Sequence, residues 1–147
     1  MYNLFLDDER YPHQVKWVEL PLVEWKIVRS YTEFVNHIKQ HGLPARVTFD
    51  HDLAFEHYPV FEADGGIHSP TTIPYDKYSE KTGYHCALWL AEYCQEKALP
   101  YPEAYIHTMN RVGKENIRSV IQPYQKIYNE HRLSNPEQHP TERWSRN

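Results

Sequence analysis

Short apolar runs that stop abruptly at acidic residues constrain this fold more than any other feature of the sequence. Residues 3–6 run directly into Asp7 and Asp8, and residues 46–49 run directly into Asp50. An apolar run without alternation is typical of a strand that is buried on both faces, as in a parallel sheet. We therefore expect parallel strands whose carboxyl ends carry acidic side chains.

Helical patterns separate these runs, so strands and helices alternate along the chain. Two further strands are expected at residues 25–29 and 104–106, and a short helix or loop at 15–22. Helices are expected from 31 to about 41, from 83 to 98 and after 110. The last helix should be kinked at Pro123. Right-handed crossovers then predict a single doubly wound, mostly parallel α/β sheet of about four strands. Such sheets bind ligands outside the carboxyl ends of their strands, where the strand order reverses.

The length of 147 residues fits one domain, expected at 1–133, followed by a polar tail at 134–147. A loop insertion at about 53–82 contains two adjacent glycines and three prolines, and a loop of this length is functional or mobile. Within it, His57 and His68 either reach the site or stay solvated. Three tyrosines either stack a base or pack against the core: Tyr75, Tyr78 and Tyr84.

Charge and hydropathy exclude several classes of protein. The net charge of -4 lacks the broad attraction that a duplex DNA-binding protein exerts. No apolar run approaches the roughly 20 residues that a membrane span needs, and no basic segment marks a signal peptide. Cys86 and Cys94 fall in one expected helix, about 12 Å apart and too far for a disulfide. We expect a reduced, cytoplasmic protein, and the oligomeric state is not predicted.

Four carboxylates are expected at the strand ends: Asp7, Asp8, Asp50 and Asp52. Carboxylates that converge repel one another unless a cation lies among them. Oxygen ligands favour Mg²⁺, or Mn²⁺ if a histidine joins them. The alternative is that acidic residues only mark exposed turns, and Asp52 suits a turn cap equally well. The pattern predicts a metal site at this edge of the sheet.

Two histidines and an arginine belong to the same edge. His51 and His107 are candidates for general acid and base, because two histidines flanking a phosphate can divide these roles. Each could instead be a buried histidine bonded to the backbone. Arg10 is a candidate phosphate ligand, or a surface partner of a neighbouring acid.

The segment before the last helix is a candidate phosphate site. Free backbone N–H groups at a helix start bind anions, and Gly113 would allow a phosphate to approach them closely. Asn110 either caps the helix or contacts the ligand, and Lys114 either contacts phosphate or is an exposed charge. A second N–H cluster begins at Thr82, where a plain helix cap is the favoured interpretation.

Several standard motifs are absent from the sequence. It has no P-loop, no Gly-x-Gly-x-x-Gly, no His-Glu-x-x-His, no Cys-x-x-Cys and no serine nucleophile elbow. Nucleotide hydrolysis by a P-loop, dinucleotide redox chemistry and a zinc-finger role therefore have no support.

Four stretches in order resemble the cyclic-phosphate processing receiver domain family. They are Leu-Phe-Leu-Asp-Asp-Glu-Arg-Tyr-Pro at 4–12, Thr-Phe-Asp-His-Asp-Leu at 48–53, Thr-Gly-Tyr at 82–84 and Ile-His-Thr-Met-Asn-Arg-Val-Gly at 106–113. The resemblance runs from about residue 3 to residue 121. The combination of Leu-Asp-Asp-x-Arg-x-Pro with Phe-Asp-His-Asp-Leu is fairly specific.

This resemblance implies a flavodoxin-like fold related to response-regulator receivers. By similarity, Asp7 and Asp8 match the acidic pair that holds Mg²⁺, and Asp50 matches the phosphoacceptor position. His107 stands where an ordinary receiver has Ser or Thr, and the lysine that follows a fifth strand in ordinary receivers is not found. These departures disfavour stable aspartyl-phosphate signalling and point to hydrolysis.

The leading functional hypothesis is a metal-dependent phosphoesterase that acts on a 2′,3′-cyclic phosphate end of RNA or on a cyclic nucleotide. Mg²⁺ or Mn²⁺ would polarise the phosphoryl oxygen and activate water. A metal-free enzyme that uses His51 and His107 alone stays open. So do a non-catalytic module that binds a nucleotide or docks a protein, and a true phosphoacceptor receiver.

Overall fold

A single four-stranded sheet forms the centre of this computed structural model, which describes residues 1–57 and 73–134. All strands are parallel and lie in the order β2-β1-β3-β4. Their bounds are Asn3–Leu6 for β1, Lys26–Val28 for β2, Arg46–Phe49 for β3 and Glu103–Ile106 for β4. The predicted α/β fold of the receiver and flavodoxin type is confirmed.

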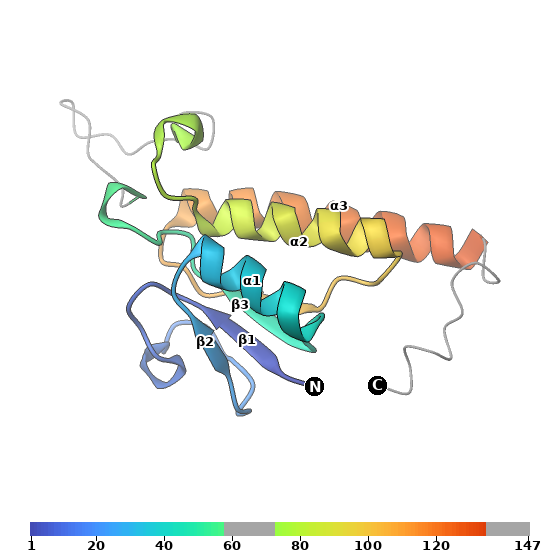
Figure 1. Ribbon diagram of the computed structural model, residues 1–147, viewed down its shortest axis with the longest axis horizontal. Helices are drawn as coiled ribbons and strands as arrows, with labels where there is room; N and C mark the ends of the chain where they lie inside the picture. The colour runs from blue at the N-terminus through green and yellow to red at the C-terminus, as the bar shows by residue number, and fades with distance from the viewer. Residues whose placement is uncertain (58–72, 135–147) are drawn as a thin grey trace.

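Three helices and three short 3₁₀ turns complete the described chain. The helices are α1 (Tyr31–His41), α2 (Gly83–Lys97) and α3 (Arg111–Ser134), and the turns are η1 (Pro12–Gln14), η2 (Phe55–His57) and η4 (Tyr75–Lys77). The Ser30 hydroxyl caps α1 by accepting a hydrogen bond from the backbone N–H of Glu33 at 3.2 Å. Residues 15–22 form a loop rather than a helix, and α3 runs through Pro123 as one continuous helix (Figure 1).

The crossovers place the helices and the first connection on opposite faces of the sheet. The chain moves from β1 to β2 in one direction and from β2 to β3 and β4 in the other. When right-handed crossovers between parallel strands run in opposite directions along a sheet, they cover opposite faces of that sheet. Accordingly, α1, α2 and α3 lie together on one side of the sheet (Figure 1), with α2 in contact with both neighbours. Residues 7–25 connect β1 to β2 on the other side.

Alternation along the strands divides the buried side chains between the two faces. Leu4, Leu6, Val47 and Phe49 belong to the main core, which they share with apolar residues of all three helices. Phe5 is equally buried but faces the connection, where its ring lies 6.4 Å from that of Trp25. The core is therefore one layer between sheet and helices, and the second face is closed by a loop.

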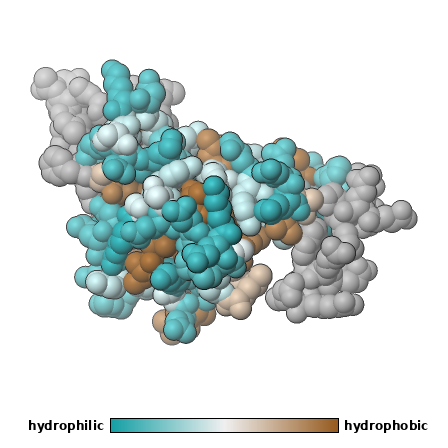
Figure 2. Space-filling model, viewed as in Figure 1, coloured by the Kyte–Doolittle hydropathy of each residue, from teal (hydrophilic) through white to brown (hydrophobic). Residues whose placement is uncertain are grey.

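Surface and core composition fit this arrangement. The face seen in Figure 2 is mostly hydrophilic, with smaller hydrophobic patches between the elements. Cys86 and Cys94 are both free, as the helical spacing predicted, and both are buried. Within residues 1–57 and 73–134, none of the helices combines the length and the apolar character that crossing a membrane requires.

Candidate active site

The carboxyl ends of β1 and β3 bring three carboxylates together. Strand β1 lies between β2 and β3, so the strand order reverses there. The pairing extends one residue past the strands, because the backbone N–H of Asp50 donates to the Leu6 carbonyl at 2.9 Å. Asp7, Asp8 and Asp50 each offer a carboxylate oxygen, and these oxygens lie within 4.8 Å of one another. The predicted convergence of these three acids is present at the switch point of the sheet.

Asp7 is fixed by hydrogen bonds to both of its oxygens. Its Oδ1 accepts from the backbone N–H groups of Glu9 at 2.9 Å and Arg10 at 2.8 Å. Its Oδ2 accepts from His107 Nε2 at 3.0 Å. Burial acts to raise the pKa of Asp7, but the hydrogen bonds from His107 and the two backbone groups outweigh it and lower the pKa. Asp7 is therefore a charged, immobile carboxylate at neutral pH.

His107 is buried between Asp7 and the sheet. Its Nδ1 lies 2.8 Å from the Thr48 hydroxyl, and its ring stacks on Phe5 at 4.7 Å. Burial lowers the pKa of His107, although the Asp7 carboxylate acts in the opposite direction. Because the ionised Asp7 can only accept, we assign the proton of the neutral ring to Nε2, and Thr48 then donates to Nδ1. Both ring nitrogens are thus engaged within the protein.

Asp50 has the opposite electrostatic character from Asp7. It accepts a hydrogen bond from the backbone N–H of His51 at 2.8 Å and another from the Thr108 side chain. Burial, followed by the charge of Asp7, raises the pKa of Asp50 to about 8. Without a cation, Asp50 therefore holds a proton at neutral pH. A bound divalent cation would favour the carboxylate form.

The three acids fit a hard divalent cation. The set consists only of carboxylate oxygens, which Mg²⁺ and Mn²⁺ prefer. Burial, and after it the charge of Asp7, raises the pKa of Asp50 by disfavouring its ionised form, and a bound cation would favour that form. Asp52, expected as a fourth ligand, does not belong to this group among the described residues. Its Oδ1 instead accepts from His51 Nδ1 at 2.7 Å and from Asn110 Nδ2 at 3.1 Å.

His51 lies beneath an aromatic cover. Because His51 Nδ1 donates to Asp52, His51 Nε2 accepts a hydrogen bond from the Tyr75 hydroxyl at 2.8 Å. That hydroxyl also accepts from the Asn116 side-chain amide at 2.7 Å, and the Tyr75 ring stacks on Tyr84 at 4.7 Å. His51 itself is fully buried. The carboxylate of Asp52 fixes the orientation of the ring, and Tyr75 occupies the nitrogen that a general base would use.

The start of α3 packs against His51. Asn110 Oδ1 accepts from the backbone N–H of Gly113 at 3.0 Å, so Asn110 caps the helix and at the same time contacts Asp52. A Cβ atom at Gly113 would lie 2.4 Å from His51 Cγ. Glycine at this position therefore allows the helix to approach His51. The N–H of Gly113, expected to bind phosphate, is bonded to Asn110.

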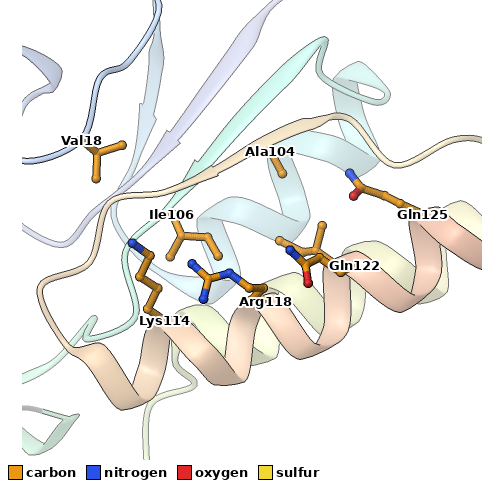
Figure 3. A pocket seen from close by; sticks show the side chains of 8 residues that line it. Val18, Ala104, Ile106, Lys114, Arg118, Gln122 and Gln125 are labelled. Atoms are coloured by element: carbon orange, nitrogen blue, oxygen red, sulfur yellow. The ribbon is translucent and has the colours of Figure 1, made fainter.

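Lys114 and Arg10, the two predicted phosphate cations, lie in different places. Lys114 lines a cavity of about 300 Å³ between β4 and α3, with Arg118 one turn later and Ile106 opposite (Figure 3). Arg10 lies at the acidic cluster, with Nη1 3.7 Å from Asp7 Oδ2. Its backbone carbonyl accepts from Arg29 Nη1 at 2.6 Å. Arg10 is therefore the cation that the structure brings to the carboxylates.

The other candidates take structural positions. Thr82 is the N-cap residue of α2. His57 accepts from the backbone N–H of Leu53 at 2.9 Å through Nδ1, and its Nε2 lies 2.7 Å from the Glu80 carbonyl, so it ties the two described ends of the loop together. His68 lies outside the described residues, as does most of the predicted 134–147 tail.

Sequence reasoning missed several residues that shape the site. A Cβ atom at Gly83 would lie 1.7 Å from the Asp50 carbonyl oxygen, so only glycine lets α2 begin against this strand end. Thr48 and Thr108 bind His107 and Asp50 through their hydroxyls. Trp17 donates from Nε1 to the His107 carbonyl at 2.6 Å. Gly83, Thr48 and Thr108 lie in the stretches that carry the family resemblance, but the sequence did not indicate which side chains or backbone atoms they contact.

The comparison with known families agrees with this geometry. The family described as "Cyclic-phosphate processing Receiver domain" matches residues 2–123 of the chain. The match includes every residue of the acidic cluster and both histidines. No curated protein and no solved structure matches the chain with significance.

Proposed function

The chain belongs to the cyclic-phosphate processing receiver domain family, and we propose that it hydrolyses a cyclic phosphate with the help of a divalent cation. The observation that carries this proposal is the meeting of Asp7, Asp8 and Asp50 at the switch point of the sheet. A buried carboxylate whose pKa is raised to about 8 beside a charged one is a costly arrangement in a purely structural site. We propose Mg²⁺ or Mn²⁺ as the ion that these residues hold.

The reaction needs one water and opens one ring. The water oxygen forms a bond to phosphorus, one P–O bond of the ring breaks, and the leaving oxygen takes a proton, which gives a phosphomonoester. A cation bound in the cluster would supply Lewis acidity and lower the pKa of a water. Arg10 has a guanidinium beside Asp7 and is proposed to hold the phosphate oxygens.

The two histidines are proposed to have different tasks. His107 orients Asp7, because its Nε2 donates to that carboxylate and Thr48 occupies its other nitrogen. His51 is the candidate for moving a proton, because Asp52 holds its ring in one orientation. Substrate would have to displace the Tyr75 hydroxyl from His51 Nε2.

The remaining predicted phosphate ligands act on this site indirectly. Asn110 holds both Asp52 and the first turn of α3. Gly113 lets that turn approach His51. Lys114, on the neighbouring cavity, is proposed to raise the local positive potential for an incoming phosphate.

Product analysis by mass spectrometry tests the proposal. Purified protein is incubated with 2′,3′-cyclic nucleotides, 3′,5′-cyclic nucleotides and cyclic dinucleotides, each with Mg²⁺, Mn²⁺ or a chelator. We expect the gain of one water on at least one compound, lost in chelator and in Asp50→Asn. The exposed-site variant Asp76→Asn is the matched control and should keep full activity. Full activity of Asp50→Asn would contradict the mechanism, and full activity in chelator would favour a metal-free reaction that uses histidines alone.

A binding module is the second candidate, and one observation favours it. His51 and His107 are both fully buried and both use their two ring nitrogens within the protein. A module of this kind would retain a cyclic nucleotide, or dock a protein, without turnover. Recovery of intact ligand after long incubation, together with stoichiometric binding, would support this alternative.

A further inference from the structure

An arginine, a tryptophan and a methionine form a surface directly beside the acidic cluster. We call Arg10, Trp17 and Met109 the Trp17 surface. The guanidinium carbon of Arg10 lies 5.1 Å from the centre of the Trp17 ring, and Nη2 lies 3.8 Å from Met109 Sδ. The other terminal nitrogen of Arg10 lies 3.7 Å from Asp7. Arg10 therefore links the carboxylates to the Trp17 surface.

The Trp17 ring is exposed and at the same time fixed. Trp17 is 41% exposed and Met109 is 67% exposed, among the few large hydrophobic residues that reach the surface. The Trp17 ring cannot turn freely, because Nε1 donates to the backbone carbonyl of His107 at 2.6 Å. A rigid aromatic ring that keeps contact with water is a ready platform for stacking.

We propose that Trp17 stacks the nucleobase of the substrate, so that the substrate is a nucleoside cyclic phosphate rather than the cyclic phosphate of a simple sugar or polyol. This inference rests on the proposed function, because Arg10 must hold the phosphate for the base to reach the ring. Arg10 touches both the cluster and Trp17, so one ligand can engage both. Met109 supplies an adaptable thioether beside the base. Stacking tolerates any base, so the surface selects for a base without selecting which one.

Matched pairs of compounds test the inference. Each pair is a nucleoside cyclic phosphate and the methyl riboside cyclic phosphate of the same ring size, which lacks only the base. We expect wild-type protein to favour the nucleoside member by roughly 5- to 150-fold in kcat/KM, the range that base–aromatic stacking supplies. Trp17→Leu should lose this preference, measured as the ratio of the two kcat/KM values within a pair, whereas Trp17→Phe should keep most of it.

A control and a binding readout keep the result interpretable. Leu22→Ala changes another exposed apolar residue of the same connection and should leave the preference unchanged. Thermal unfolding of each variant shows whether loss of the bond to His107 has altered the fold, and Trp17→Phe loses the same bond while it retains a ring. Calorimetric binding of both compounds gives the preference even if turnover is absent.

The outcomes separate this inference from the proposed function. Equal turnover of both compounds by wild type, or an unchanged preference in Trp17→Leu, overturns the stacking role and leaves hydrolysis standing. Binding without turnover overturns hydrolysis, and the ratio of the two affinities then decides the role of Trp17. If neither compound binds, both the stacking role and the proposed function are overturned.

Discussion

Two neighbouring carboxylates in this site differ in charge because their hydrogen-bond partners differ. Asp7 receives donors from two backbone N–H groups and His107, and these keep it ionised. Asp50 is buried beside that negative charge and keeps its proton until the pH reaches about 8. Without a cation, Asp7 is therefore ionised and Asp50 is protonated at neutral pH. Single substitutions test this difference.

Replacement of Asp50 should change how stability depends on pH. The ordinary pKa of an aspartate is 3.8, and in the folded protein the pKa of Asp50 is raised to about 8. Between these values only the folded state holds the proton, so in chelator the free energy of unfolding should fall as the pH rises. Asp50→Asn removes this decrease in the free energy of unfolding. Above pH 8 the variant should therefore be more stable than wild type by roughly 1–3 kcal/mol.

Urea unfolding in chelator, at pH values below and above this window, measures the effect. Asp76→Asn, on an exposed residue of η4, should follow the wild-type curve. Added Mg²⁺ should stabilise wild type and leave Asp50→Asn unchanged. A wild-type curve as flat as that of Asp50→Asn would show that Asp50 is not held protonated by its surroundings.

Two substitutions of His107 separate orientation of Asp7 from proton transfer. His107→Phe keeps a ring against Phe5 but removes the donor to Asp7, and should weaken Mn²⁺ binding by roughly 10- to 100-fold. His107→Gln restores an N–H donor and should recover part of that affinity. Calorimetric Mn²⁺ titration gives both values. If His107→Gln binds Mn²⁺ as wild type does and yet has no turnover, His107 moves a proton rather than orienting Asp7.

At the level of whole elements, α2 and α3 both begin against the carboxyl ends of the strands. Each of these helices needs a glycine in its first turn to approach so closely. Gly83 lets α2 start over the Asp50 carbonyl, and Gly113 lets α3 start over His51. The N–H of Gly83 also donates to the His51 carbonyl at 2.8 Å. The site is thus closed from two sides by helix starts whose close approach excludes even a methyl group.

Gly113→Ala should destabilise the protein and disturb His51. The added methyl would lie 2.4 Å from His51 Cγ, so the ring or the helix must shift, at a cost of roughly 1–3 kcal/mol. Alanine is otherwise the better helix former. Gln122→Ala, at an exposed position of the same helix, is the control and should change stability little. A Gly113→Ala protein as stable as wild type, by thermal unfolding, would show that α3 does not need this approach.

The elements were predictable from the sequence to the extent that local pattern determines them. Apolar runs cut off by acid located β1 and β3, and the alternation of strands with helices predicted parallel strands with these acids at one edge. The meeting of Asp7 with Asp50 also requires β1 and β3 to be neighbours, which the structure shows. The roles of Gly83, Thr48 and Trp17 were not predicted, because they arise from contacts with distant segments. Asp52 matched the pattern of a ligand, but its place beside His51 depends on the turn that follows β3.

At the scale of the whole molecule, the reversal of strand order at β1 gathers the site from separate segments. The connection after β1 contributes Arg10 and Trp17, the turn after β3 contributes Asp50, and the turn after β4 contributes His107 and Met109. None of these segments contains the full set. The site therefore forms only when the sheet is complete, which couples any activity to folding.

Hydrolysis in water labelled with ¹⁸O shows whether this protein opens a cyclic phosphate with the help of a divalent cation. The protein is incubated with Mg²⁺ and the cyclic phosphate that it turns over in the product analysis above. The mass of the product is then measured by mass spectrometry. We expect a phosphomonoester with one labelled oxygen on phosphorus, formed by wild type and absent with Asp50→Asn or chelator. An intact, unlabelled ligand recovered from wild-type protein, or a labelled product from Asp50→Asn at the wild-type rate, would contradict this mechanism.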